Sequence, residues 1–206
     1  PKTLIGLWKL AELSSISLDD SGNGLIIGSG VSLSEVVEHP EILNNFPALA
    51  KAASLVSAPQ LRNMGTIGGN LCLDTRCNYY NQTFQWRKSL GFCLKKTESP
   101  MQNGAICWVA RSSPRCLAVS SSDCAPVMVA LDAEFQLMNP DGKRIVPAGG
   151  FYKNDGMDFL NKTPDELLVS IRLPFHEGWK MNYRKLSRRN AIDFPVLGVA
   201  VALRLD

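Results

Sequence analysis

Short apolar runs separated by turn residues open the chain, a pattern typical of β-strands. The apolar run at 25–28 follows the turn residues Ser21-Gly-Asn-Gly, so residues 4–31 are predicted to form short strands. Apolar side chains then recur at helical spacing, and they predict two helices on either side of the break at His39-Pro40, residues 32–37 and 41–55.

The second half of the chain returns to strand-like patterns around one apolar stretch. Residues 125–131 are predicted to form a helix, and the turn Asn139-Pro-Asp-Gly predicts a hairpin. The predicted strands are 105–111, 116–119, 134–138, 144–146, 167–173, 179–186 and 196–203. Helices and strands are therefore mixed along the chain.

Two segments break these patterns. Residues 57–71 have no period and place three glycines in the five positions from Gly65 to Gly69, which indicates a functional or tightly turned loop. Residues 73–105 are aromatic and polar, with an apparent extra turn at 98–104. A structureless stretch of about 30 residues is improbable in a compact domain unless something organises it.

Composition narrows the class of protein. Of the 206 residues, 45% are hydrophobic and 20% are charged, and the net charge is +3, as in ordinary globular proteins. The basic residues are scattered, which argues against nucleic-acid binding through bulk charge. No apolar run approaches the roughly 20 residues of a membrane-spanning helix, and no segment resembles a secretory signal. We therefore expect a soluble cytoplasmic protein, excerpted from a longer polypeptide.

The cysteines are clustered. All six lie between residues 72 and 124. In a reducing compartment, clustered thiols more often bind metal or act in redox chemistry than form disulfides. We therefore expect the thiols to organise the irregular segment 73–105.

The glycine-rich segment 65–70 reads Gly-Thr-Ile-Gly-Gly-Asn and lacks the spacing of a Rossmann phosphate loop. Consecutive glycines still allow backbone N–H groups to converge on a diphosphate. Thr66 and Asn70 add side-chain donors. The alternative is a tight structural turn, and the neighbouring Arg62, Cys72 and Cys77 favour the functional interpretation.

Four segments resemble the flavin-binding subunits of the xanthine oxidase family of molybdenum hydroxylases. They are Leu61-Arg-Asn-Met-Gly-Thr-Ile-Gly-Gly-Asn-Leu71, Ser122-Asp-Cys-Ala-Pro-Val-Met-Val-Ala-Leu131, Glu166-Leu-Leu-Val-Ser-Ile-Arg-Leu-Pro174 and Tyr183-Arg-Lys-Leu-Ser-Arg-Arg-Asn-Ala-Ile-Asp193. The resemblance implies an α+β fold, a two-lobed FAD-binding domain of the PCMH (vanillyl-alcohol oxidase-like) type over residues 1–206. The family's first diphosphate loop and its C-terminal domain are expected outside this chain.

The cysteine-bearing stretch resembles one branch of the family more closely. Residues 70–81, Asn-Leu-Cys-Leu-Asp-Thr-Arg-Cys-Asn-Tyr-Tyr-Asn, are similar to the β subunits of 4-hydroxybenzoyl-CoA reductases, in which an inserted loop carries a [4Fe–4S] cluster. The resemblance implies such a loop over residues 73–117. Its implied ligands are Cys77, Cys93, Cys107 and Cys116, whereas Cys72 and Cys124 are interpreted as small buried residues.

The same resemblance implies the FAD contacts. The diphosphate would lie on Thr66, Ile67, Gly68, Gly69 and Asn70. Further contacts would come from Asp123 to a flavin or ribose hydroxyl, Leu168 to the rings, Lys185 near the isoalloxazine and Asp193 along the flavin face. A cation near reduced flavin would tune its potential.

The function implied by the resemblance is electron transfer, and none of these residues is expected to be catalytic. A ferredoxin-type donor would reduce the [4Fe–4S] cluster, which passes electrons through FAD to partner subunits that carry [2Fe–2S] clusters and the molybdenum cofactor. There, 4-hydroxybenzoyl-CoA would be dehydroxylated to benzoyl-CoA. One alternative is the FAD subunit of a xanthine, CO or aldehyde dehydrogenase-type hydroxylase, with electrons flowing from molybdenum to NAD or a quinone. Another alternative is a zinc-stapled binding module without redox activity.

Overall fold

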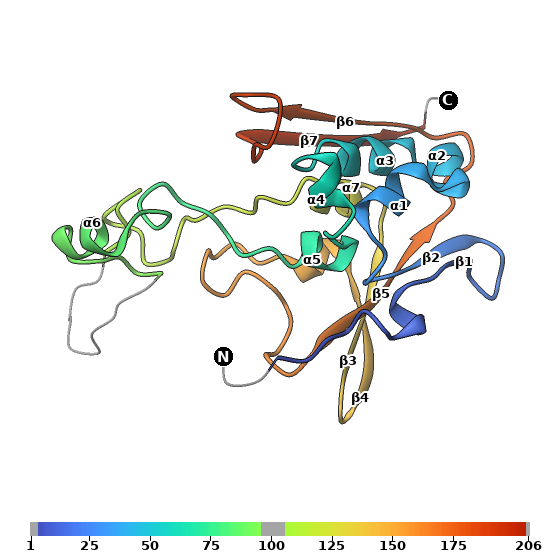
Figure 1. Ribbon diagram of the computed structural model, residues 1–206, viewed down its shortest axis with the longest axis horizontal. Helices are drawn as coiled ribbons and strands as arrows, with labels where there is room; N and C mark the ends of the chain where they lie inside the picture. The colour runs from blue at the N-terminus through green and yellow to red at the C-terminus, as the bar shows by residue number, and fades with distance from the viewer. Residues whose placement is uncertain (1–3, 96–105, 205–206) are drawn as a thin grey trace. The chain divides into compact units, whose positions relative to one another are not determined.

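The computed structural model describes residues 4–95 and 106–204, and the chain divides into two compact units (Figure 1). Unit one combines Pro1–Cys72, Ser122–Phe151 and Lys162–Asp206, and unit two combines Leu73–Ser121 and Tyr152–Asn161. Among the described residues, every strand and all helices but one belong to unit one. The predicted extra turn at 98–104 lies outside the described residues.

Unit one contains a five-stranded sheet with the strand order β1-β2-β5-β3-β4. The central strand β5 pairs with β2 on one side and with β3 on the other, and all pairings are antiparallel. An antiparallel sheet covered by helices is an α+β arrangement, as predicted. The strands are β1 (Ile16–Leu18), β2 (Gly24–Gly28), β3 (Glu134–Asn139), β4 (Gly142–Pro147) and β5 (Leu167–Pro174).

The buried face of this sheet forms part of the core. Ile27, Phe135 and Ile171 are fully buried and lie opposite one another across β2, β5 and β3. Phe151, at the end of α8 (Ala148–Phe151), packs edge-on against Phe135 with ring centroids 4.9 Å apart. Each such side chain removes roughly 150–250 Å² of surface from water.

The predicted first helix is α1 (Leu33–Glu38), and the predicted second helix is in fact two. Ser32 begins α1 with a capping box, because its hydroxyl accepts from the Glu35 N–H and the Glu35 carboxylate accepts from the Ser32 N–H. The second helical stretch divides into α2 (Pro40–Asn45) and α3 (Pro47–Ser54) at Phe46. Pro47 causes the division, since the residue before a proline is forced out of the helical region.

Residues 57–71 are more regular than predicted. They contain α4 (Pro59–Arg62) and α5 (Ile67–Leu71), two helices too short to show a periodic pattern. The predicted helix at 125–131 is α7 (Ala125–Ala130). The predicted last two strands pair as the hairpin β6 (Lys180–Leu186) and β7 (Leu197–Leu203), on which α3 and α7 pack (Figure 1).

Unit two is mainly irregular, with α6 (Phe84–Ser89) as its helix among the described residues. The predicted strands at 105–111 and 116–119 are wrong. Between residues 106 and 119 the backbone makes no strand, residue 105 lies outside the described residues, and Val119 forms only an isolated bridge to Arg76. Apolar runs form strands only when a partner strand takes up their hydrogen bonds, and none lies beside these runs. No helix in the described part of the chain is long and apolar enough to span a membrane.

Candidate cofactor sites

The glycine-rich segment of unit one is the start of α5. Thr66 caps this helix through its Oγ1, which accepts from the Gly69 N–H at 3.1 Å. Gly68 is buried against Ser29, and a Cβ at Gly68 would lie 2.6 Å from the Ser29 Cβ. Gly69, in contrast, is exposed, and a Cβ there would meet only the Thr66 Oγ1, at 3.1 Å. The two adjacent glycines therefore serve different purposes.

The backbone N–H groups of α5 are all used within the protein. The Ile67 N–H donates to Val31 O and the Gly68 N–H to Ser29 O, both at 2.9 Å, while the N–H groups of Gly69 and Asn70 bond to Thr66. A diphosphate would have to exchange with these partners to reach the N–H groups, and the contacts of Thr66, Ile67, Gly68, Gly69 and Asn70 with FAD stay predictions. The segment that follows β2 accepts the hydrogen bonds of Ile67 and Gly68 through its carbonyl oxygens. The Thr66 hydroxyl keeps its own proton, because it serves only as an acceptor in the cap.

Asn70 joins α5 to the start of α7. Its side chain is buried, and its Oδ1 accepts from the Ser122 Oγ at 2.7 Å and from the Cys124 N–H at 3.3 Å. Ser122 in turn caps the Ala125 N–H at 3.0 Å. Asn70 thereby fixes the loop that carries Asp123.

Asp123 is the centre of a buried polar group. Its Oδ1 accepts from the Tyr183 hydroxyl at 2.7 Å, and its Oδ2 accepts from the Lys185 ammonium at 2.9 Å. Burial raises the pKa of the Asp123 carboxyl, although both donors act in the opposite direction. Burial also raises the pKa of Tyr183, and its bond to Asp123 adds to the effect. Tyr183 therefore acts as a hydrogen-bond donor.

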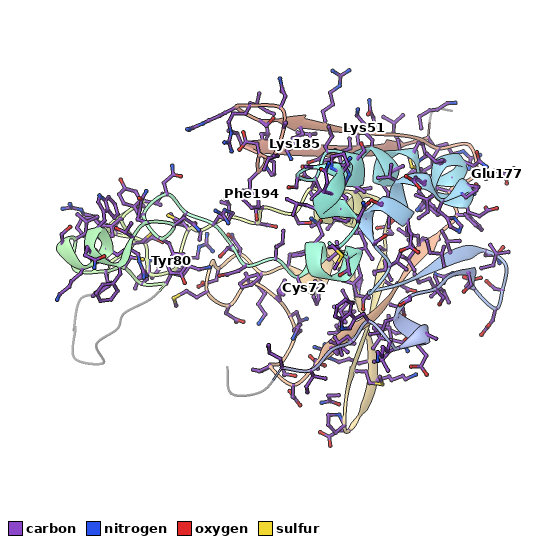
Figure 2. The ribbon with its side chains drawn as sticks, viewed as in Figure 1. Lys51, Cys72, Tyr80, Glu177, Lys185 and Phe194 are labelled. Carbon is purple, nitrogen blue, oxygen red and sulfur yellow. The ribbon has the colours of Figure 1, made fainter. Side chains whose placement is uncertain are left out.

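The structure joins Asp123 and Lys185 in an ion pair that the sequence analysis did not predict. Their contacts with flavin stay predictions, and the lysine already has a full set of partners. Lys185, which is labelled in Figure 2, donates to Asp123, to Leu55 O at 2.9 Å and to Asp193 O at 2.7 Å. An ammonium has three protons, so every donor position has an acceptor. A hydrogen bond from Lys185 to the isoalloxazine would require one of these bonds to be exchanged.

Asp193 and Leu168 both have contacts within the protein. The Asp193 carboxylate accepts from the backbone N–H groups of Arg188 and Arg189, at 3.0 and 3.1 Å. Burial acts to raise the pKa of Asp193, but these N–H groups outweigh it and lower the pKa. Leu168 is buried in β5, beside the bulge at Leu137. The contacts of both residues with flavin stay predictions.

Sequence reasoning missed Tyr183, for which a signal existed. Tyr183 and Lys185 are two apart on β6, so their side chains share one face of the strand. Gly198 lies on the paired strand β7, where a Cβ would come within 2.6 Å of the Tyr183 hydroxyl. A strand reading Tyr-x-Lys opposite a glycine therefore points to a buried polar group.

In unit two, the four cysteines named as cluster ligands line one cavity. Cys77, Cys93, Cys107 and Cys116 share it with mainly apolar neighbours, and its empty volume is about 260 Å³. The other two cysteines belong to unit one, and all six are free thiols.

The surroundings of these thiols favour the thiolate form at Cys107. Burial acts to raise its pKa, but the backbone N–H groups of Val109, Ala110 and Leu117 donate toward its sulfur, and together they lower the pKa. At Cys116, burial raises the pKa, as do the nearby sulfurs of Cys107 and Cys93. The thiols therefore lie within one another's electrostatic reach.

The described thiols are not arranged around a single ion. Among the residues that the structure describes, no group of three or more His, Cys, Asp or Glu side chains is placed to hold one metal ion. A tetrahedral Zn²⁺ site needs four thiolates about 2.3 Å from one centre. A [4Fe–4S] cluster distributes its four thiolates over four irons and needs a wider spacing. The zinc-stapled and the iron–sulfur interpretations of these thiols both stay predictions.

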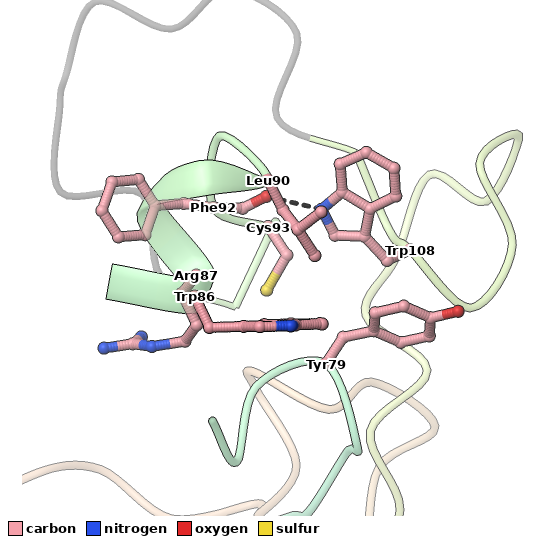
Figure 3. Close-up of a pocket in the computed structure, with 7 residues that line it drawn as sticks. All are labelled: Tyr79, Trp86, Arg87, Leu90, Phe92, Cys93 and Trp108. Atoms are coloured by element: carbon pink, nitrogen blue, oxygen red, sulfur yellow. Dashed lines mark hydrogen bonds between the residues drawn. The ribbon is translucent and has the colours of Figure 1, made fainter. Parts of the chain in front are cut away.

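A second, aromatic cavity adjoins the cysteine cavity and shares Cys93 with it (Figure 3). The Cys93 side chain points into it among the rings of Tyr79, Trp86 and Trp108. Tyr79 lies between the two indoles, with ring centroids 6.3 Å from Trp86 and 6.5 Å from Trp108. The Trp108 indole is fixed by a 2.7 Å hydrogen bond to Phe92 O.

Comparison with known proteins identifies the family. Residues 1–176 match the family described as the FAD binding domain in molybdopterin dehydrogenase. The chain belongs to this family. Membership confirms the predicted fold class and the coarser part of the sequence interpretation, a flavin-binding domain of the molybdenum hydroxylases.

The family has relatives in several enzymes. The chain is 32% identical to the aldehyde oxidoreductase FAD-binding subunit PaoB of Escherichia coli over 94% of this chain and 62% of the relative. It is 28% identical to the carbon monoxide dehydrogenase medium chain of Hydrogenophaga pseudoflava, over 99% and 54%. The chain thus spans about half to three fifths of the length of these curated relatives.

Solved structures agree with the fold. A Cu,Mo-CO dehydrogenase in its cyanide-inactivated form matches 97% of this chain and 53% of its own, with a TM-score of 0.68 and 24% identity. The carbon monoxide dehydrogenase of Hydrogenophaga pseudoflava that lacks the Mo-pyranopterin moiety matches 95% of this chain and 51% of its own. Its TM-score is 0.64 at 28% identity.

Proposed function

We propose that the chain is the FAD-binding part of an electron-transfer subunit in a molybdenum hydroxylase. The family match over residues 1–176 carries this proposal. Its relatives are named as subunits or chains of aldehyde, xanthine and carbon monoxide oxidoreductases. The partners would be subunits with the molybdenum cofactor and [2Fe–2S] clusters, and electrons would flow from molybdenum through this chain to an external acceptor.

The donor set of α5 fits a bound diphosphate in one particular way. The exposed Gly69 leaves open the space around the Thr66 hydroxyl, which a Cβ would crowd. Bound FAD would supply the ability to accept electrons in pairs and release them singly. Thr66 would donate its proton to a phosphate oxygen past Gly69, while Ile67, Gly68 and Asn70 hold α5 in place. Asp123 would accept from a flavin or ribose hydroxyl, and Leu168 and Lys185 keep their proposed places near the rings.

We further propose that unit two holds a [4Fe–4S] cluster through Cys77, Cys93, Cys107 and Cys116. Three observations support this assignment: the shared cavity, the exclusion of the other two cysteines from it, and the N–H groups directed at Cys107. Such a cluster transfers single electrons, and N–H donors to its sulfurs stabilise the added charge. It would link the flavin to an external one-electron carrier.

The direction of electron flow separates the two interpretations of the cluster. The relatives favour flow out of the enzyme, as in a dehydrogenase or oxidoreductase. The resemblance of the cysteine stretch favours flow inward from a ferredoxin-type donor, toward reductive dehydroxylation of 4-hydroxybenzoyl-CoA. Reduction of the flavin in the whole enzyme by an aldehyde, or only by reduced ferredoxin, would decide between them.

The cofactor assignment is tested by the composition of the full-length subunit purified without oxygen. We expect one FAD, four irons and four acid-labile sulfides per chain, with an EPR signal after dithionite reduction. Flavin without iron would refute the cluster and leave the flavoprotein assignment intact. Zinc in place of iron would refute the redox role of unit two.

Cysteine variants test the ligand assignment directly. Cys107→Ser should lose iron and sulfide, because a hydroxyl is a poor substitute for a thiolate ligand. Cys124→Ser is the matched control: its thiol is fully buried in unit one, and its iron content should equal that of the wild type. Full iron in Cys107→Ser would remove that ligand from the set.

A further inference from the structure

A buried ammonium group lies beside the cysteine cavity, and the sequence analysis assigns it no role. The Lys95 side chain is only 6% exposed. Its Nζ donates to Asp74 Oδ1 at 2.7 Å, to Gly156 O at 2.9 Å and to Thr75 O at 3.1 Å, and it also bonds the Thr75 hydroxyl. The ammonium is therefore fixed in position.

Aromatic rings hold the cation on its other sides. Its Nζ lies 5.1 Å from the centroid of Tyr80 and 5.6 Å from that of Phe159, distances at which a ring face attracts a cation. Its counter-ion Asp74 is 60% exposed, so water screens the carboxylate much more than the ammonium. Inside unit two, the positive charge of Lys95 is therefore screened less than the negative charge of Asp74.

Lys95 lines the same cavity as the four cysteines. Its positive charge therefore lies at the wall of the cavity that the four sulfurs share. Burying a lysine is costly, and replacing a buried ion pair with apolar residues is often neutral or stabilising. Stability alone therefore gives a poor account of a lysine at this position.

We propose that Lys95 sets the reduction potential of the iron–sulfur cluster bound in this cavity. The inference rests on the proposed cluster. A cluster with four thiolates is negatively charged and gains one further negative charge on one-electron reduction. A fixed cation in a medium of low dielectric stabilises that added charge more strongly than a surface lysine could. Lys95 therefore raises the potential and eases reduction of the cluster.

Two variants, which should shift the midpoint potential in opposite directions, test the proposal in the full-length subunit. Lys95→Met removes the cation and keeps the length of the side chain, so the midpoint potential should fall. Asp74→Asn removes the counter-charge and should raise the potential by a smaller amount, because Asp74 is largely exposed. The midpoint is measured by redox titration followed by EPR, without any assay of turnover.

Two controls separate charge from packing. Lys95→Arg retains the charge and should keep the potential near that of the wild type. Lys153→Met removes another lysine of unit two, whose Nζ pairs with Asp158 at 2.8 Å outside the cysteine cavity, and it should have little effect. Both controls should hold the same iron as the wild type.

The outcomes are distinct. Unchanged potentials in Lys95→Met and Asp74→Asn, or shifts of both in the same direction, would overturn the proposal. If Lys95→Met cannot hold the cluster, Asp74→Asn decides alone. The Asp74 side chain is largely exposed and contributes little to packing, so an upward shift of the potential in Asp74→Asn would come from the change in charge. A wild-type protein without iron would instead refute the cluster itself, and the iron analysis reveals this before any titration.

Discussion

Gly68 and Gly69 are neighbours in sequence and yet face different surroundings, so their alanine variants should separate folding from binding. A Cβ at Gly68 would lie 2.6 Å from the Ser29 Cβ and 2.7 Å from the Ser29 carbonyl oxygen. Gly68→Ala should therefore lower the free energy of unfolding by about 1–3 kcal/mol, as overpacked cores do. Urea unfolding measures this, and an unchanged midpoint would contradict the packing.

Gly69→Ala should instead act on FAD. The added methyl group would crowd the Thr66 hydroxyl while improving helix propensity by up to about 1 kcal/mol. Loss of one hydrogen bond to a charged group, about 1.5–3 kcal/mol, corresponds to roughly 10- to 100-fold weaker FAD binding. Flavin fluorescence titration of the full-length protein measures the affinity. Equal affinity with equal stability would remove Thr66 from the diphosphate site.

The buried group around Asp123 predicts two unequal losses of stability. Lys185→Met would leave a buried carboxylate without its ion-pair partner and should cost about 3–5 kcal/mol. Tyr183→Phe would remove one neutral donor and should cost about 1–3 kcal/mol. Both are read from urea unfolding at pH 7. A larger loss in Tyr183→Phe than in Lys185→Met would show that the ion pair is not the main constraint.

Single residues were predictable where their roles are local. Two serines, Ser32 and Ser34, could begin the first helix from the sequence alone, and the structure shows that Ser32, three residues before Glu35, is the cap. The hydroxyl of Thr75 donates to Gly156 O, 81 positions away, and the hydroxyl of Tyr183 donates to Asp123, 60 positions away. No local sequence pattern indicates such pairs. The four cluster cysteines became a hypothesis through resemblance, since their spacing alone identifies no site.

At the scale of elements, most strands of unit one and the helices α1, α2, α3 and α7 could be predicted, and three other helices could not. Strands β3 and β6 alternate between more and less buried positions, the period-two pattern of a strand with one covered face. Helices α4 and α5 are only four and five residues long and too short for a period. Helix α6 lies in the aromatic and polar stretch that has no clean helical period. The runs at 105–111 and 116–119 show the converse, apolar stretches that lack a partner strand.

The ion pair between Arg144 on β4 and Glu166, just before β5, predicts that the stability of the fold depends on pH. Arg144 Nε donates to Glu166 Oε1 at 2.5 Å, and this bond is the main cause that lowers the pKa of Glu166 to about 2. A carboxylate with a lowered pKa contributes stability above its unfolded pKa, near 4.3, and loses the contribution as pH falls toward 2.

Arg144→Met should therefore lower the melting temperature at pH 7, and the difference from the wild type should shrink between about pH 4.3 and 2. Thermal melts monitored by circular dichroism across this range measure the effect. Lys143→Met, on the same exposed strand, is the control. A difference that persists at pH 2 would assign the loss to packing of the Arg144 side chain.

Charge is distributed unevenly over the whole molecule. Residues 76–121 contain seven Lys or Arg and one Glu, although the whole chain has a net charge of only +3. The exposed aromatic side chains Tyr79, Phe84 and Trp86 lie in the same stretch. An aromatic surface with surplus positive charge is suited to an acidic partner.

Electron exchange between this protein and an acidic one-electron carrier should therefore slow as ionic strength rises, because screening weakens steering. Stopped-flow measurement of the bimolecular rate from low to physiological salt tests this. Arg87→Gln and Lys88→Gln together should lower the rate at low salt and flatten the dependence on salt. A rate independent of salt would exclude electrostatic steering at this surface.

Unit two is assembled from two separate stretches of chain, and this constrains how such a module can be transferred. Residues 152–161 supply Gly156, whose N–H donates to Cys116 O at 2.9 Å and where a Cβ would lie 2.7 Å from the Cys116 sulfur. A graft of residues 73–121 into a relative would leave this contact to whatever the host provides. A transfer of this module that keeps the contact must therefore move residues 152–161 together with residues 73–121.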